Sequence, residues 1–191
     1  MTLAPAIPGP DGPVGGWQAR AVKRRPTLSL NEWAVLGLLA ERPRHGYDIA
    51  AELQPDAELG QVWRLDRPLV YRAVERLVAL GLAEAQGTEP GAGGPPRTVH
   101  AATDEGRERL DGWLREPVEH VRDMRSGFLL KLVVARRLGV DAGPLVRAQR
   151  ERLDAQLSAL GAPPPPDHVV ALWRHHAARA ARDFLEAVEA G

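Results

Sequence analysis

The stretch "RLDRPLVYRAVERLVALGL" (Arg64–Leu82) decides how the rest of the sequence is interpreted. Its apolar residues recur at the spacing of one face of an α-helix, which predicts a buried stripe. The stripe consists of Val70, Val74, Leu77 and Val78. Asp66 is placed to cap the start of this helix, and Pro68 suits a first turn, where an N–H has no intrahelical partner. The opposite face is crowded by Arg67, Tyr71, Arg72 and Arg76, in a chain of zero formal net charge.

Length and composition narrow the class of protein. A chain of 191 residues with 44% apolar residues can form one large domain or two small ones around a packed core. The absence of cysteine excludes disulfides and thiolate metal sites. No apolar run approaches the roughly 18 residues that a membrane span needs, and no signal peptide is evident. We therefore expect a soluble, cytoplasmic protein without a membrane partner.

Charge is distributed unevenly along the chain. Residues 1–27 have a net charge of +3, because they hold four basic residues and one acidic residue. Residues 28–103 hold seven basic and ten acidic residues and have a net charge of −3, whereas residues 104–191 hold fourteen of each. No segment is basic enough to indicate nucleic-acid binding by itself, so any such function depends on where the charges lie.

The pattern of helix and strand signals predicts a winged helix-turn-helix over residues 28–115. A tail rich in proline and glycine, residues 1–27, precedes it and is expected to be disordered, although Lys23–Arg24–Arg25 could touch phosphates as an arm. Ser29 and Glu32 form a capping box for a first helix. A second helix is expected from about His45 to Leu53, and the opening stretch is the third.

The following residues predict the wing. "LAEAQ" and "RTVHA" read as two short strands, and "GTEPGAGGPP" between them is too rich in glycine and proline for a helix. Thr103 is then placed to cap a helix, "DEGRERLDGWLREP". The predicted fold is mainly α, with a small β-hairpin wing.

Residues 116–191 predict a separate helical domain. One segment, "FLLKLVVARRLG", is apolar nearly all round, and "PLVRAQRERLDAQLSAL" has apolar residues at heptad-like spacing. In a last helix, apolar residues again repeat every three or four positions. They are Val170, Trp173, Ala177, Ala180, Phe184 and Ala187. Such a hairpin is expected to form a homodimer interface, with packing against its own winged domain as the alternative.

Three quoted segments carry a family resemblance. "LLAERPRHGYDIAAEL", "VWRLDRPLVYRAVERLVALGL" and "GGPPRTVHAATDEGRERL" follow one another with the order and spacing of the PadR family of bacterial transcriptional regulators, over about residues 30–115. The resemblance implies a homodimer that binds double-stranded operator DNA, usually as a repressor and often released by a small aromatic or lipophilic effector. Two departures concern specificity: Pro68–Leu69 stand where the family commonly has Gly-Thr, and Val99–His100 stand where it has two aromatics.

Candidate DNA contacts follow from the position of the third helix as a recognition helix in the major groove. Arg67 and Arg72 are best placed for base edges, and Tyr71 for a base edge or a phosphate. Phosphate candidates are Arg64, Arg76, Arg97, His45 and Tyr47. For each arginine the alternative is a solvated helix face or an ion pair, and for each tyrosine it is packing.

The tryptophans suggest a place for an effector. Five are present against only two tyrosines and two phenylalanines. In some members of the family that the sequence resembles, a tryptophan of the helix after the wing lines an effector site. Trp113 stands in that helix here. The alternative is that Trp113 packs in the core. We interpret Trp33 and Trp63 as core residues, and Trp17 lies in the tail.

Enzyme motifs are absent, so we expect no catalytic site and no cofactor. None of the few serines lies in G-x-S-x-G, and the chain has neither a P-loop nor H-E-x-x-H. His168, His175 and His176 are interpreted as surface histidines and not as metal ligands. A winged-helix module that binds a protein in place of DNA, or a dimer whose main purpose is ligand binding, remains an alternative function.

Overall fold

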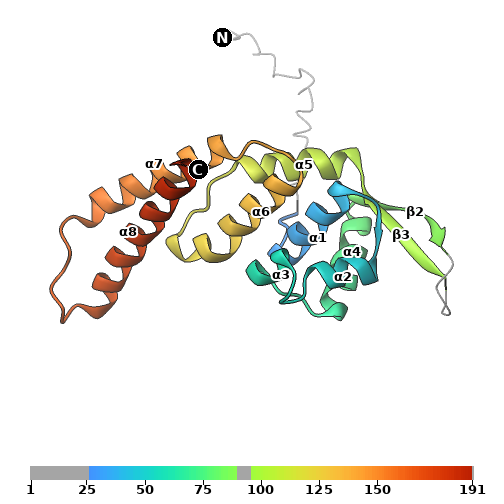
Figure 1. Cartoon of the computed structure of the whole chain (residues 1–191), viewed down its shortest axis with the longest axis horizontal. Coiled ribbons are helices and arrows are strands. Elements are labelled where there is room, and N and C mark those ends of the chain that lie inside the picture. The colour runs from blue at the N-terminus through green and yellow to red at the C-terminus, as the bar shows by residue number, and fades with distance from the viewer. Residues whose placement is uncertain (1–25, 90–95, 191) are drawn as a thin grey trace, which may run out of the picture.

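The computed structural model describes residues 26–89 and 96–190. Figure 1 shows an elongated molecule with the two-stranded wing at one end and a long helical hairpin at the other. The tail cluster Lys23–Arg24–Arg25, Trp17 and most of the predicted wing tip lie outside the described residues. Within them, no helix combines the length and apolar character needed to cross a membrane.

The winged part contains short helices and a three-stranded sheet, and the rest of the described chain is helical. The elements of the winged part are α1 (Leu30–Glu41), β1 (Arg44–His45), α2 (Gly46–Glu52), α3 (Glu58–Val62), α4 (Arg67–Ala79), β2 (Ala83–Glu89), β3 (Arg97–Ala102) and α5 (Asp104–Arg115). The remaining elements are the 3₁₀ turn η1 (Val121–Asp123), the π turn η2 (Met124–Phe128), α6 (Leu129–Arg137), α7 (Gly143–Leu160) and α8 (Val169–Ala190).

The start of the winged part follows its local sequence signals. The Ser29 hydroxyl accepts from the Glu32 N–H, and the Glu32 carboxylate accepts from the Ser29 N–H at 2.6 Å, which confirms the capping box. α1 is buried along most of its length and is the centre of the winged core. His45 caps α2, since its Nδ1 accepts from the Asp48 N–H at 3.4 Å.

The wing forms the antiparallel hairpin that the sequence predicts. β3 is the central strand of the sheet, with β2 on one side and the two residues of β1 on the other. The β2–β3 register runs from Ala83 opposite Ala102 to Glu89 opposite Arg97, with an irregularity between Ala85 and Gly87. A small bulge of this kind increases twist, which suits a hairpin that projects from the domain.

The end of β3 and the start of α5 are fixed to the turn after α4. The Thr103 hydroxyl accepts from the Gly106 N–H at 3.1 Å, which confirms the predicted cap, and donates to the Gly81 carbonyl at 2.7 Å. A Cβ on Gly106 would come 2.1 Å from the Leu82 carbonyl oxygen, so only glycine lets α5 approach this closely. The spacing of Thr103 and Gly106 therefore holds the wing base against α4.

α6 joins the two ends of the molecule. Its residues Leu130, Val134 and Ala135 are buried in the winged core, whereas Phe128, at its start, lies in a second core with residues of α7 and α8. α7 and α8 pack against each other, burying Leu153 and Leu185. The predicted C-terminal helices thus form, and α6 belongs to both cores.

The apolar repeat predicted for the last helix is not the face that α8 buries in this chain. α8 buries His175, Ala178 and Leu185 against its neighbours. Val170 and Trp173 of the predicted stripe are 65% and 71% exposed. The stripe therefore forms an uncovered apolar face.

Several expectations are wrong in detail. The sequence predicts three helices before the wing, but a fourth, α3, lies between α2 and α4, and β1 adds a third strand. The Asp66 side chain makes no capping hydrogen bond, and its carboxylate lies 3.6 Å from the Arg64 guanidinium. Val78 is 40% exposed and so lies outside the buried stripe, and His175 is buried, not a surface histidine.

Candidate nucleic-acid interface

The predicted recognition helix, α4, presents two chemically distinct faces. Its apolar face buries Val70, Ala73, Val74 and Leu77 against the winged core. Its other face is exposed and carries the arginines and the tyrosine singled out from the sequence, Arg67, Tyr71, Arg72 and Arg76. The helix begins at Arg67 with Pro68 in the first turn, as predicted, so free N–H groups and a guanidinium lie together at its N-terminus.

Side chains from α4 and β3 meet at the ring of Tyr47, which belongs to α2. The Arg67 guanidinium, at the start of α4, lies 5.0 Å from the ring centroid. The Arg97 guanidinium, at the start of β3, lies 5.3 Å from the same centroid. Both distances are within the range of cation–π attraction. Tyr47 of α2 therefore brings a recognition-helix arginine and a wing arginine to one surface point.

Tyr71 lies over the start of α2. A Cβ placed on Gly46 would come 2.4 Å from the Tyr71 ring, so the glycine before Tyr47 allows this approach. Both tyrosines remain largely accessible, at 48% exposure for Tyr47 and 45% for Tyr71. Neither ring is buried as a core residue.

The arginines differ in how far they are neutralised. Arg76 lies 3.1 Å from the Glu32 carboxylate, and Arg64 pairs loosely with Asp66. Arg67 and Arg72 make no ion pair with any described side chain. These two guanidinium groups therefore carry uncompensated positive charge on this face, and Arg97 is exposed near them.

His45 is already engaged within its own helix. Its Nδ1 caps α2, and its Nε2 lies 3.2 Å from the Asp48 carboxylate. An exchange of partners would be needed before its imidazole could contact a phosphate.

A cavity of about 750 Å³ opens between the recognition helix and the wing. Four of the predicted site residues line it: His45, Tyr47, Tyr71 and Arg97. Other lining residues come from the second half of α4 and from β3, and they include Val74, Val78 and His100. Burial lowers the pKa of His100, and the backbone of Thr98 offsets this only in part, so the imidazole is neutral at pH 7.

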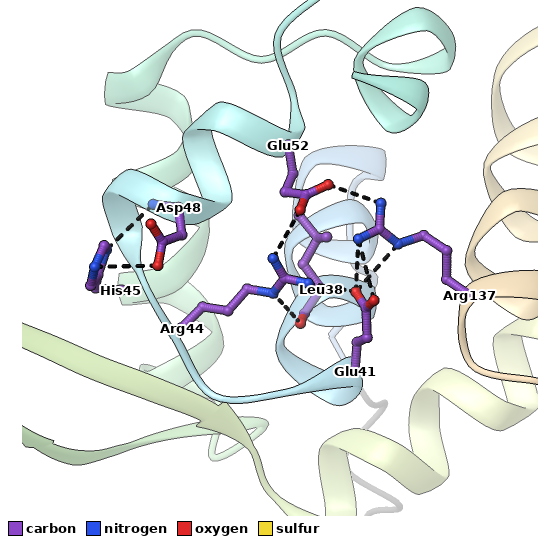
Figure 2. A network of polar contacts seen from close by, with 7 residues as sticks. All are labelled: Leu38, Glu41, Arg44, His45, Asp48, Glu52 and Arg137. Carbon is purple, nitrogen blue, oxygen red and sulfur yellow. Dashed lines mark hydrogen bonds and ion pairs between the residues drawn. The ribbon is translucent and has the colours of Figure 1, made fainter. Parts of the chain in front are cut away.

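A cluster of four charges, which sequence reasoning missed, lies where α1, β1, α2 and α6 meet (Figure 2). We call it the charge junction: Glu41 of α1, Arg44 of β1, Glu52 of α2 and Arg137 of α6. Arg44 is 2% exposed and donates to the Leu38 carbonyl at 3.2 Å, to Glu52 at 3.0 Å and to Glu41 at 2.6 Å. In the sequence Arg44 looks like one more basic residue in "RPRHGY", and nothing there signals its burial.

Arg137 completes the charge junction from the C-terminal side. It donates to both carboxylates, at 2.9 Å to Glu41 and 2.9 Å to Glu52. Burial alone would raise the pKa of Glu52, but the hydrogen bonds and charges of Arg137 and Arg44 outweigh it and lower the pKa. Two cations and two anions thus neutralise each other where α6 meets the winged domain.

Trp113 lies apart from the face of α4. Its ring stacks on Trp33 with centroids 4.7 Å apart and planes 10° from parallel, and the Lys131 ammonium lies 4.5 Å from the centroid. Lys131 donates to the carbonyls of Trp113 and Glu116, and burial lowers its pKa to about 8. Trp63 is half-buried, packs on the winged core and donates to Asn31 at 2.9 Å.

The helices, the turn and the hairpin together define a winged helix-turn-helix protein. Residues 35–112 match the family described as transcriptional regulator PadR-like, and we assign this segment to that family. No curated protein matches the sequence.

Solved structures give weaker likenesses. PadR of Bacillus subtilis in complex with operator DNA is 22% identical, with 85% of this chain and 98% of that chain covered and a TM-score of 0.46. Smu.1604c of Streptococcus mutans UA159 is 20% identical, with 84% and 98% covered and a TM-score of 0.42. Bacillus subtilis PadR in complex with p-coumaric acid is 21% identical, with 83% and 93% covered and a TM-score of 0.39.

Proposed function

We propose that this protein is a DNA-binding transcriptional regulator that acts as a homodimer on a pseudo-palindromic operator. The observation that carries the proposal is the convergence of Arg67 and Arg97 on the Tyr47 ring, with the Arg67 guanidinium free of ion pairs among the described side chains. A recognition helix and a wing that meet at one positively charged point suit a duplex whose major groove and backbone are contacted together. The family match over residues 35–112 supports the same function.

The predicted DNA contacts differ in whether a carboxylate already neutralises them. Arg67 and Arg72 are proposed to reach guanine edges, and Arg97 is proposed to contact a phosphate from the wing. Tyr47 and Tyr71 are exposed beside them and can donate hydroxyl hydrogen bonds to the backbone. Phosphate contacts of lesser weight are assigned to Arg64, Arg76 and His45, because each already has a carboxylate partner.

The dimer is proposed to form through the uncovered apolar face of α8. The large exposed apolar side chains on that side of α8 are Val169, Val170, Trp173, Phe184 and Val188, which are 37% to 71% exposed. A continuous apolar face of this kind is typical of an interface between subunits. The dimer would place its two α4 helices about 34–36 Å apart, one turn of B-DNA.

We further propose that the bound dimer represses transcription and that a small aromatic or lipophilic effector releases it. Trp113 stays the tentative effector contact, although its stacking on Trp33 leaves only part of the ring available. An effector that favours a different spacing of the two α4 helices would weaken DNA binding through its differential affinity for two states.

The test is a mobility shift with the DNA upstream of the protein's own gene, at moderate salt. Arg67→Ala and Arg72→Ala should each weaken binding by roughly tenfold or more, the value of one good base contact. Arg152→Ala is the matched control, since it removes one exposed charge from α7, at the other end of the molecule in Figure 1. If both α4 variants bind as tightly as the control, the recognition-helix assignment is wrong.

Salt dependence separates this function from a protein-interaction module. DNA binding predicts that affinity falls steeply as salt rises, because cations are released from the phosphates. The −3 charge of residues 28–103 motivates the alternative, which predicts no salt-dependent DNA affinity at all.

A further inference from the structure

One large aliphatic side chain is exposed at the N-terminal end of α4. Leu69 is the third residue of this helix and is 38% exposed. Single exposed leucines are common on protein surfaces, so it is the position of this one that has to be explained. It lies in the first turn of the proposed recognition helix, and the N-terminal residues of such a helix are the ones that reach base edges.

Leu69 lies on the edge of α4 that is away from the wing. The other large apolar side chains exposed on α4, Tyr71 and Val78, line the cavity beside the wing. Leu69 precedes Tyr71 by two residues, a rotation of about 200°, so the two side chains leave the helix on opposite edges. Arg72 follows Leu69 by three residues, and residues at this spacing are neighbours on a helix surface. A leucine and an arginine without an ion pair among the described side chains therefore lie side by side.

The backbone at this position has little to offer DNA. Pro68 has no N–H, and the Leu69 N–H donates to the Asp66 carbonyl at 2.9 Å. The leucine side chain has no donor or acceptor. Any contribution of Leu69 to DNA binding therefore comes from contact with an apolar group.

The major groove presents one prominent apolar group, the C5-methyl group of thymine. The other groups at the base edges are hydrogen-bond donors and acceptors, and a leucine placed over them would remove their water without replacing the hydrogen bonds. Over a thymine methyl group, by contrast, two apolar surfaces leave water together, which is favourable. The chemistry of Leu69 thus favours thymine over the other bases.

We propose that Leu69 is a specificity-determining residue that contacts the C5-methyl group of one thymine in each half-site of the operator. The proposal rests on the proposed function, because it requires α4 to lie in the major groove. Neighbouring helix residues have Cβ atoms about 5–6 Å apart, and base pairs are stacked about 3.4 Å apart. The thymine therefore lies within about three base pairs of the base that Arg72 is proposed to reach.

The test compares two versions of the DNA upstream of the protein's own gene, one made with thymidine and one with deoxyuridine in its place, which removes only the methyl groups. Wild type should bind the deoxyuridine fragment about fifteenfold more weakly, because one buried methyl group corresponds to about fourfold and a dimer makes the contact twice. Leu69→Ala should bind the thymidine fragment more weakly than wild type and lose most of the difference between the fragments. Equal binding of wild type to the two fragments, or an undiminished difference in Leu69→Ala, would overturn the proposal.

The matched control is Arg97→Ala. It removes a proposed phosphate contact, so it should weaken binding to both fragments and keep the full difference between them. Loss of the difference in this variant too would show that the methyl effect does not belong to Leu69. Leu69→Ala is expected to fold, because Leu69 is exposed and alanine favours a helix, and urea unfolding checks this.

Deoxyuridine placed at one thymine at a time then locates the contact. The loss is expected at one pair of symmetry-related thymines, within about three base pairs of the position where Arg72→Ala relaxes the sequence preference. A loss spread evenly over many thymines, or confined to more distant ones, would contradict a contact by Leu69. Absence of wild-type binding to either fragment would refute the proposed function and this contact with it, whereas equal binding to both refutes the contact alone.

Discussion

Arginine has opposite roles in two regions of this molecule. In the charge junction, Arg44 and Arg137 are matched by two carboxylates and Arg44 is almost fully buried. On the face of α4, Arg67 and Arg72 are exposed and have no carboxylate partner among the described side chains, and Arg97 of the wing is exposed near them. The comparison teaches that zero net charge of the whole chain does not exclude a locally positive surface, because a carboxylate neutralises only the arginines that lie close to it.

The largest effect is expected from breaking the charge junction. Arg44→Ala leaves Glu41 and Glu52 with one cation between them and removes the partner of the Leu38 carbonyl. Loss of one partner from a buried ion pair costs about 3–5 kcal/mol, and the partly exposed carboxylates here suggest the lower value, about 3 kcal/mol. Urea unfolding measures the free-energy change.

The control for that measurement comes from the other region. Arg97→Ala removes an exposed arginine and should change the free energy of unfolding by no more than about 0.5 kcal/mol. Equal destabilisation by Arg44→Ala and Arg97→Ala would remove the distinction between the two regions.

The next prediction distinguishes the roles of Arg67 and Arg97 in the proposed DNA contact. Arg97→Ala should weaken binding to operator and non-operator DNA equally, because a phosphate contact carries no sequence information. It should also lower the slope of log affinity against log salt concentration by about one. Arg67→Ala should instead reduce the free energy of operator binding by about 1–3 kcal/mol. It should also relax the sequence preference of the protein at one base pair. Binding titrations over a range of salt on both DNAs give the two slopes; the reverse pattern would exchange the assigned roles.

A second buried cation, Lys131, donates to backbone carbonyls and predicts an effect of pH on stability. Burial lowers its pKa from 10.5 to about 8, so across this window the unfolded chain holds a proton that the folded chain has released. Stability should therefore rise with pH from about 8 toward 10.5, by roughly 1–2 kcal/mol over the accessible part of the window. Unfolding free energies of wild type and Lys131→Met on either side of pH 8 isolate the effect, and a matching slope in the variant would contradict it.

The smallest effect on stability is expected where α2 meets α4. In Gly46→Ala the new methyl would overlap the Tyr71 ring, which is half exposed and can rotate away, so the cost should stay below about 1 kcal/mol. Displacement of Tyr71 should nevertheless reduce operator affinity several-fold. The double variant Gly46→Ala/Tyr71→Ala should bind no more weakly than Tyr71→Ala alone; additive losses would show that Gly46 acts by another route.

Local signals in the sequence predicted much of the winged part. Each of these signals is contained within a few neighbouring residues: the capping box of Ser29 and Glu32, the Thr103 cap, and the change of period after Gly81. The structure confirms the helices and strands that they predict. The exposed arginines of α4 followed from helical periodicity in the same way. The family resemblance is confirmed over the segment that the family match covers.

Features that depend on distant residues could not be predicted. Arg137 lies 85 residues from Glu52 and 96 from Glu41 along the chain, and no spacing rule brings it to them. α3 is five residues long and too short to show a period, and Val78 fits the apolar stripe by spacing although the wing leaves it half uncovered.

The two-residue strand β1 makes the molecule sensitive to the length of its sequence. Neighbouring residues of a strand point to opposite faces, and Figure 2 shows Arg44 directed into the charge junction and His45 away from it, toward Asp48. A one-residue insertion or deletion just before Arg44 would exchange these directions, placing an imidazole among the carboxylates and a guanidinium at the α2 cap. We therefore expect the four residues between α1 and α2 to tolerate no change in length.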